Sequence, residues 1–136
     1  MIDSDAEKEV RAVIDAITEA LNASDAEKLG SLLSDRHGST HIGTDPNEWW
    51  TKQQLVAGVK EATSVGESQA RAEHGEVSVH VLGDVAWAEG MGKFTNGEGA
   101  ERATRMTGVF VREDGQWKAA QIHASIGVAN ENIFDS

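Results

Sequence analysis

The chain has 136 residues, of which 26% are charged and 39% hydrophobic, with a formal net charge of -11. This length and balance indicate one globular domain over residues 1–136. The scattered lysines and arginines argue against nucleic acid or an anionic membrane as a partner. Cysteine and tyrosine are absent, which excludes disulfides, thiolate metal ligands and phenolic acids. With no signal-peptide or membrane-spanning pattern, we expect a cytoplasmic protein.

Three helices are predicted in the first half of the chain. Ser4–Glu7 resembles a capping box, and apolar residues then recur at helical spacing, which predicts a helix over about 5–22. A second capping box at Ser24–Glu27 predicts a shorter helix. A third at Thr51–Gln54 begins another helix with one apolar side, and a loop around Gly66 ends this half.

The second half of the chain alternates apolar and polar residues with a period of two, which is typical of strands. Turn signals rich in glycine, asparagine and aspartate separate the runs. Together with one short strand between the helices, the predicted strands cover 39–44, 70–82, 85–94, 103–112 and 117–127. This order predicts an α+β fold, in which a curved, mostly antiparallel sheet packs on three N-terminal helices.

Alternation assigns the side chains of this sheet to two faces. A two-residue turn at Gly83–Asp84 places Val81 opposite Ala86 and Val79 opposite Ala88, so small aliphatic side chains share one face. Because the helices need an apolar partner, we expect this face to lie beneath them. Glycines further along the same face leave room for a ligand.

The opposite face then carries Trp87, Met91, Trp117 and His123. A large apolar patch of this kind usually marks an association surface, so we expect a homodimer through this convex face. The reverse assignment would point His123 and Glu89 into the cavity and make them part of an active site. Period-two patterning separates the faces but does not say which one is internal.

The loop that precedes the third helix contains the only proline, two acids and two of the four tryptophans. Indole side chains beside carboxylates are costly to expose and hard to bury in a small core. The wall of a small-molecule pocket suits them. Glu48, Trp49 and Trp50 of this loop are therefore candidate ligand-binding residues.

Three side chains are candidate acids or bases: Asp45, His41 and His123. Each also has a structural interpretation. Asp45 suits an Asx-type hydrogen bond within its own loop, His41 can brace that loop, and His123 can form hydrogen bonds at a dimer face. No metal site is predicted, because the histidines lack HxH or HExxH spacing, and no cofactor is predicted either.

Five short motifs follow one another along the chain: Gly43–Trp50, Gly83–Trp87, Asp114–Trp117, Gln121–Ser125 and Gly127–Glu131. In this order and spacing, they resemble the SnoaL-like branch of the nuclear transport factor 2-like superfamily. It implies a cone-shaped α+β barrel, also called cystatin-like, with a pocket between helices and sheet and usually a dimeric assembly. The superfamily includes isomerases, cyclases, hydrolases and non-catalytic modules, so the resemblance implies a fold more directly than a function.

Two functions follow from these observations, and whether the protein is an enzyme stays open. The first is a pocket protein that binds a hydrophobic small molecule without a recognisable catalytic set. The alternative is an isomerase, cyclase or hydrolase that transfers protons with Asp45 or a histidine. The chain lacks the tyrosine of ketosteroid isomerases, whereas His41 or His123 with Asp45 could imitate the pair of SnoaL-type cyclases. The expected ligand-binding residues are Trp49, Trp50, Glu48, Phe94, Met106, Phe110 and Ile122.

Overall fold

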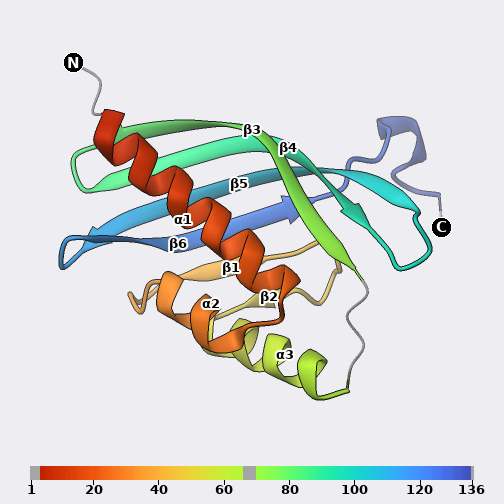
Figure 1. The fold of residues 1–136 in the computed structure, drawn as a ribbon. Coiled ribbons are helices and arrows are strands. Elements are labelled where there is room, and N and C mark those ends of the chain that lie inside the picture. Colours follow the sequence, from red (N-terminus) through yellow and green to blue (C-terminus); the bar gives the residue numbers. More distant parts are fainter. Residues whose placement is uncertain (1–3, 66–69, 136) are drawn as a thin grey trace.

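The structure, a computed structural model, describes residues 4–65 and 70–135. The helices are α1 (Ser4–Asn22), α2 (Ala26–Leu32) and α3 (Lys52–Val65), with a short 3-10 helix at Asn130–Asn132 (Figure 1). The strands are β1 (Thr40–Ile42), β2 (Trp49–Trp50), β3 (Arg71–Leu82), β4 (Val85–Thr95), β5 (Glu101–Glu113) and β6 (Gln116–Ser125). The loop predicted around Gly66 lies outside the described residues.

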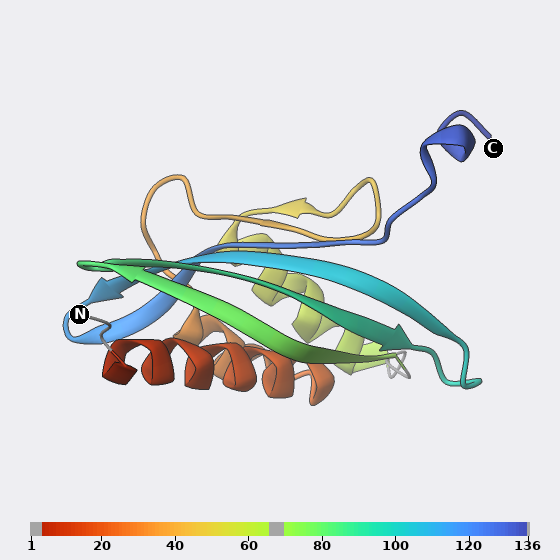
Figure 2. The ribbon, with the colours of Figure 1, turned by 90° about the horizontal axis from the view of Figure 1, so that it is seen from above.

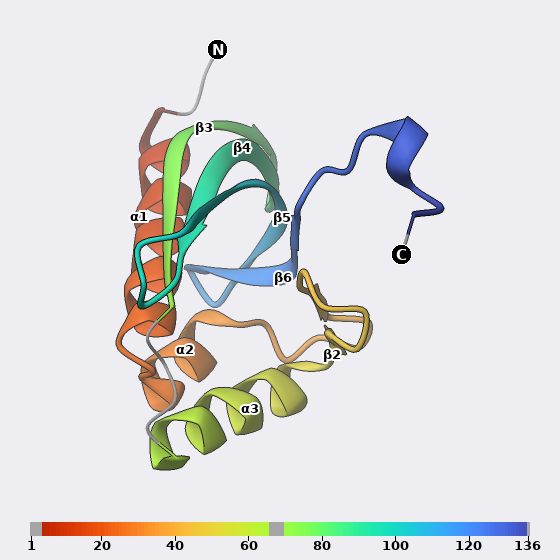
Figure 3. The same ribbon diagram turned by 90° about the vertical axis from the view of Figure 1, so that its right-hand side faces the viewer.

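All six strands form one curved sheet in the order β2-β1-β6-β5-β4-β3. Neighbouring strands are antiparallel except β1 and β6, which run parallel. Helix α1 lies along the inner side of the sheet, and α2 and α3 lie near the end that holds β1 and β2 (Figures 2 and 3). This arrangement confirms the predicted cone of three helices on a mostly antiparallel sheet. None of the described helices combines the length and apolarity needed to cross a bilayer.

Capping side chains decide where two of the helices begin. At α3 the Thr51 amide donates to Gln54 Oε1 over 2.9 Å, and the Gln54 amide donates to Thr51 Oγ1 over 3.2 Å. This reciprocal pair is the predicted capping box. At α2 the cap is Asp25, which accepts from the Lys28 amide, and not the predicted Ser24, whose φ is +53°.

The aliphatic face of the sheet lies beneath α1, as predicted. Val81 pairs with Ala86 and Val79 with Ala88, which is the register that the two-residue turn required. Val79, Ala86 and Ala88 are buried together with the apolar stripe of α1. Burying this stripe against the sheet supplies the main apolar contact between the two layers.

Trp117 is a correction to the predicted outer face, because its side chain lies inside and is only 4% exposed. Its indole Nε1 donates to Glu9 Oε2 of α1 over 3.0 Å. The cause is a shift in register between β5 and β6, where Val109 pairs with Gln121 but Phe110 pairs with Ala119. The extra residue of this β-bulge reverses the alternation along β6, so Trp117 faces inward although His123 faces outward.

His41 is the one histidine that the structure buries in the core. It lies in β1 between Trp50 of β2 and Ile122 of β6 and is 3% exposed. Neither ring nitrogen has a hydrogen-bond partner among the described residues. Burial lowers the pKa of His41 from 6.5 to about 4, because a desolvated site disfavours the charged imidazolium.

The burial of His41 predicts a loss of stability in mild acid. Below pH 6.5 the imidazole of His41 binds a proton in the unfolded chain, whereas in the folded chain it does so only near pH 4. The free energy of unfolding is therefore unaffected by this group above pH 6.5 and decreases as the pH falls below that value. Between pH 7.5 and 5 the loss is about 2 kcal/mol for this group. Urea unfolding of the wild type and of His41→Phe at both pH values isolates the part of the stability loss that comes from His41. Parallel pH profiles for the two proteins would contradict the assignment.

Candidate functional site

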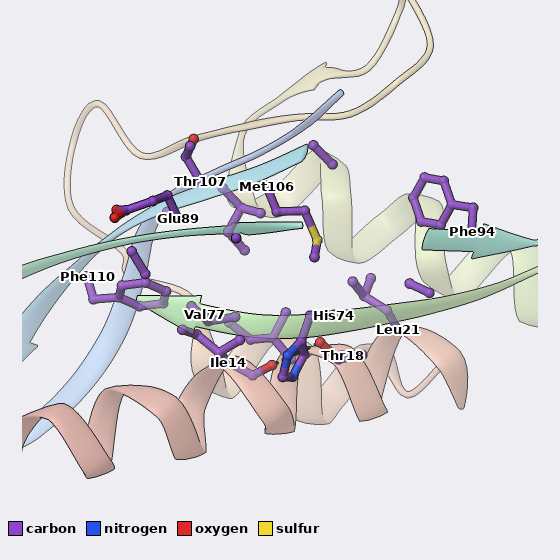
Figure 4. A pocket seen from close by; sticks show the side chains of 17 residues that line it. Ile14, Thr18, Leu21, His74, Val77, Glu89, Phe94, Met106, Thr107 and Phe110 are labelled. Atoms are coloured by element: carbon purple, nitrogen blue, oxygen red, sulfur yellow. Dashed lines mark hydrogen bonds between the residues drawn. The ribbon is translucent and has the colours of Figure 1, made fainter. Parts of the chain in front are cut away.

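A cavity of about 130 Å³ lies between α1 and the inner face of the sheet. Helix α1 and the four long strands all contribute to its wall. Its apolar lining residues are Ile14, Ile17, Leu21, Ala72, Val77, Ala88, Phe94, Met106, Phe110, Ile122 and Ala124. Glu89 and Thr107 also border it, but their polar ends point away from the space, so the interior is almost wholly apolar (Figure 4).

Small residues on the inner face leave this space open. Gly90 and Gly108 both line the cavity, on neighbouring strands. A Cβ atom at Gly90 would lie 2.9 Å from the carbonyl oxygen of Glu76, and one at Gly108 would lie 3.0 Å from the Phe110 ring. Both distances are too short for ordinary contact, so the backbone of β3 and the ring of Phe110 approach closely only because these positions are glycine.

A β-bulge in β3 turns an additional side chain toward α1. His74 pairs with Gly92 and Val77 with Gly90, so three steps along β3 correspond to two along β4. Residues three apart in a regular strand face opposite sides, but this bulge puts His74 and Val77 on the same inner face. The sequence analysis did not single out His74. The available signal was Gly75, because an isolated glycine within a strand pattern often marks a bulge.

His74 forms a pair with Asp15 of α1 at the rim of the cavity. The distance between His74 Nε2 and Asp15 Oδ1 is 2.7 Å, and His74 Nδ1 lies 3.0 Å from the carbonyl oxygen of Gly75. Both partners are hydrogen-bond acceptors, so the ring satisfies both contacts when both nitrogens carry protons. The imidazole is 22% exposed, which places a polar group where the apolar cavity meets solvent.

The predicted ligand-binding residues divide into two groups. Phe94, Met106, Phe110 and Ile122 line the cavity. The loop residues Trp49, Trp50 and Glu48 are not among its lining residues, because β1 and β2 form the far edge of the sheet. The Trp49 side chain is 70% exposed, whereas Trp50 lies against α3, where a Cβ at Gly58 would be 3.9 Å from its ring.

The two carboxylates of the tryptophan loop bind the loop's own backbone. Asp45 Oδ1 accepts from the Asn47 amide over 2.8 Å, which is the Asx-type bond considered above. Glu48 Oε1 accepts from the Asp45 amide over 2.8 Å. A Cβ at Gly43 would lie 2.6 Å from Glu48 Oε1, so the glycine makes room for this brace. Both acids therefore order the hairpin that connects β1 and β2.

The three predicted acids or bases do not converge on one site. His123 is exposed and pairs in register with Thr107 of β5, whose hydroxyl points away from the cavity (Figure 4). His41 is buried in β1, and Asp45 is exposed in its loop. Within the described part of the chain, no group of three or more histidine and acidic side chains is arranged to hold a metal ion.

Several solved structures share this fold over most of their length. An NTF2-like protein of unknown function from Pseudomonas putida KT2440 has a TM-score of 0.81 and 21% identity, with 100% of this chain and 99% of that chain covered. A protein of unknown function from Mycobacterium tuberculosis has a TM-score of 0.78 and 15% identity, covering 97% and 80%. A domain of unknown function with a cystatin-like fold from Nostoc punctiforme has a TM-score of 0.76 and 18% identity, covering 98% and 84%.

At these identities the structural likeness establishes the fold alone. No curated protein matches the chain in sequence. The sequence does match the SnoaL-like domain family over residues 10–129, which includes all six strands and most of α1. The chain therefore belongs to the family of SnoaL-like domains, and its fold is the one found in the NTF2-like protein from Pseudomonas putida.

Proposed function

We propose that this protein binds a small apolar molecule in the cavity between α1 and the sheet. The observation that carries the proposal is an almost wholly apolar space of about 130 Å³, bordered by one helix and four strands. A closed apolar cavity of about 150 Å³ in another protein stays dry and binds benzene. A single aromatic ring or a short branched alkyl group is therefore the right size for this space.

Binding of toluene tests this function. At ten times its Kd, toluene should stabilise the protein by about 1.4 kcal/mol, which corresponds to roughly 5 °C in Tm. Ala124→Leu places a larger side chain in the cavity and should abolish the shift. Ala57→Leu makes the same change on the exposed side of α3 and should preserve it. An equal response of the two variants to toluene would place binding elsewhere.

The His74–Asp15 pair supports a second candidate function, proton transfer to or from a ligand in the cavity. A histidine held by a carboxylate at the edge of an apolar site is suited to general acid–base chemistry. Because both ring nitrogens already contact acceptors, a carbonyl oxygen of the ligand would have to replace Asp15 or the Gly75 carbonyl before the ring donates a proton to it. This pair takes the role that the sequence analysis considered for Asp45, His41 and His123.

Deuterium exchange at the α-carbon of phenylacetone tests proton transfer without knowledge of the natural substrate. The wild type should accelerate exchange in D₂O, as measured by proton NMR, because a proton donor at the carbonyl oxygen favours the enol while water removes the α-proton. His74→Gln should reduce the acceleration by about 10²-fold or more. His80→Gln, a histidine on the outer face, is the control. Exchange that is unaffected by His74→Gln would leave only the binding function.

We also propose that the outer face of the sheet forms a homodimer. The Trp87 and Met91 side chains on this face are 44% and 58% exposed. The His80 ring stacks on Trp87 with 5.4 Å between ring centroids, and its Nε2 lies 2.7 Å from Glu89 Oε1. Exposed aromatic and Met side chains among polar groups are typical of an association surface. His123 lies on the same face, whereas Trp117 is buried and is no part of it.

Light scattering of Trp87→Glu tests this dimer. The wild type should have twice the mass of one chain, and the variant should be monomeric because it places an added charge in an apolar contact. Trp49→Glu makes the same change at the exposed tryptophan of β2 and should remain dimeric. A monomeric wild type, or a Trp87→Glu variant that stays dimeric, would show that this face is not the interface.

A further inference from the structure

A second, polar cleft opens beside the apolar cavity, between α1 and the bulge of β3. Its volume is about 220 Å³. It shares Ile14, His74 and Val77 with the cavity, so the two spaces adjoin at these residues. Figure 4 shows these three residues together on the side of the cavity nearest α1 and β3. A molecule in the apolar cavity whose polar end extends past these residues would place this end in the cleft.

Arg11 is the cation of the cleft, and it has no ionic partner among the described residues. Its guanidinium donates a hydrogen bond to the carbonyl oxygen of Val77, which holds it across the bulge. Within residues 4–65 and 70–135, no carboxylate lies at ion-pair distance from it. Asp15, one turn further along α1, is instead paired with His74. The exposed guanidinium therefore has unused donors in the cleft that adjoins the apolar cavity.

We propose that the ligand of this site is a small aromatic or branched aliphatic monocarboxylate, with its hydrocarbon part in the cavity and its carboxylate on Arg11. This inference rests on the proposed binding function and specifies the chemistry of its ligand. Guanidinium groups bind carboxylates through paired hydrogen bonds, and one that a backbone carbonyl already holds loses less conformational freedom on binding.

The other charged side chains of the cleft restrict the ligand to a single negative charge. Glu76 also lines the cleft, and its carboxylate repels an anion bound nearby. Asp15, whose Oδ1 lies 2.7 Å from His74 Nε2, is a second carboxylate of the cleft and also opposes further negative charge. One ligand carboxylate is balanced by Arg11, whereas a second would face Glu76 without a cation of its own.

Three probes of similar shape test the proposal by calorimetry: toluene, phenylacetamide and phenylacetate. All three place one ring in the cavity, but only phenylacetate brings a negative charge to the cleft. The wild type should bind phenylacetate at least tenfold more tightly than phenylacetamide. This preference should decrease as salt is added, because the contact with Arg11 is ionic and partly exposed.

Two variants assign the preference to this cleft. Arg11→Gln should weaken phenylacetate binding by about tenfold and leave the Kd for toluene unchanged. Glu76→Gln removes the repelling charge and should strengthen phenylacetate binding several-fold, and it does not involve the hydrogen bond that spans the bulge. The second variant keeps the test valid if Arg11→Gln fails to fold.

The outcomes separate this inference from the function on which it rests. Toluene binding with equal affinity for phenylacetate and phenylacetamide would contradict the carboxylate site and leave apolar binding intact. A preference for phenylacetate that neither variant changes would also contradict it. Failure of both toluene and phenylacetate to bind would overturn the proposed function as well as the inference.

Discussion

Helix α1 buries its apolar stripe against the inner face of the sheet. Which side chains lie on this face depends on where the inward–outward alternation along each strand is interrupted. Two β-bulges set this pattern. In β3, the bulge between His74 and Val77 turns an imidazole toward α1. In β6, the shift between Gln121 and Ala119 turns Trp117 toward α1. Without these bulges, α1 would lack the hydrogen bond from Trp117 to Glu9 and the pair between His74 and Asp15.

The two bulges act at opposite parts of the layer between α1 and the sheet. The bulge in β6 fills one part with an indole, which contributes several kcal/mol of buried apolar surface. The bulge in β3 opposes Gly90 and Gly92, whose missing side chains let the two backbones approach. The space that remains is about 130 Å³, well below the roughly 300–1,000 Å³ typical of pockets for drug-sized ligands. A steroid-sized molecule would require the cavity to expand, whereas a single ring would not.

Local patterns predicted the fold well, because each acts over a few residues. The turn at Gly83–Asp84 connects two adjacent strands directly, so the pairing of Val79 with Ala88 followed from the sequence. The capping box at Thr51 likewise involves only four residues. Trp117 could not be assigned to a face in this way. One inserted residue between Ala119 and Gln121 puts the alternation before it out of phase with the alternation after it.

The candidate site was harder to predict because it depends on contacts between distant parts of the chain. Alternation assigned Phe94 and Ile122 to the inner face, and both line the cavity together with the predicted Met106 and Phe110. The tryptophan loop attracted attention by its composition, but Asp45 and Glu48 bind their own backbone. His74 and Asp15 are 59 positions apart, and nothing local to either residue indicates the other. Only Gly75 marked the place where the pattern changes.

The net charge of -11 disfavours the approach of an anionic ligand, but charge at long range and charge at the site act differently. At physiological ionic strength, salt screens exposed charges beyond about 8 Å. The acids scattered over the surface therefore lower the rate at which an anion approaches more than they lower the affinity once it is bound. Affinity depends on the nearest groups, and in the cleft these are Arg11, Glu76 and the hydrogen-bonded pair of Asp15 and His74. The acidic surface then favours small, singly charged molecules over larger polyanions, which agrees with the size of the cavity.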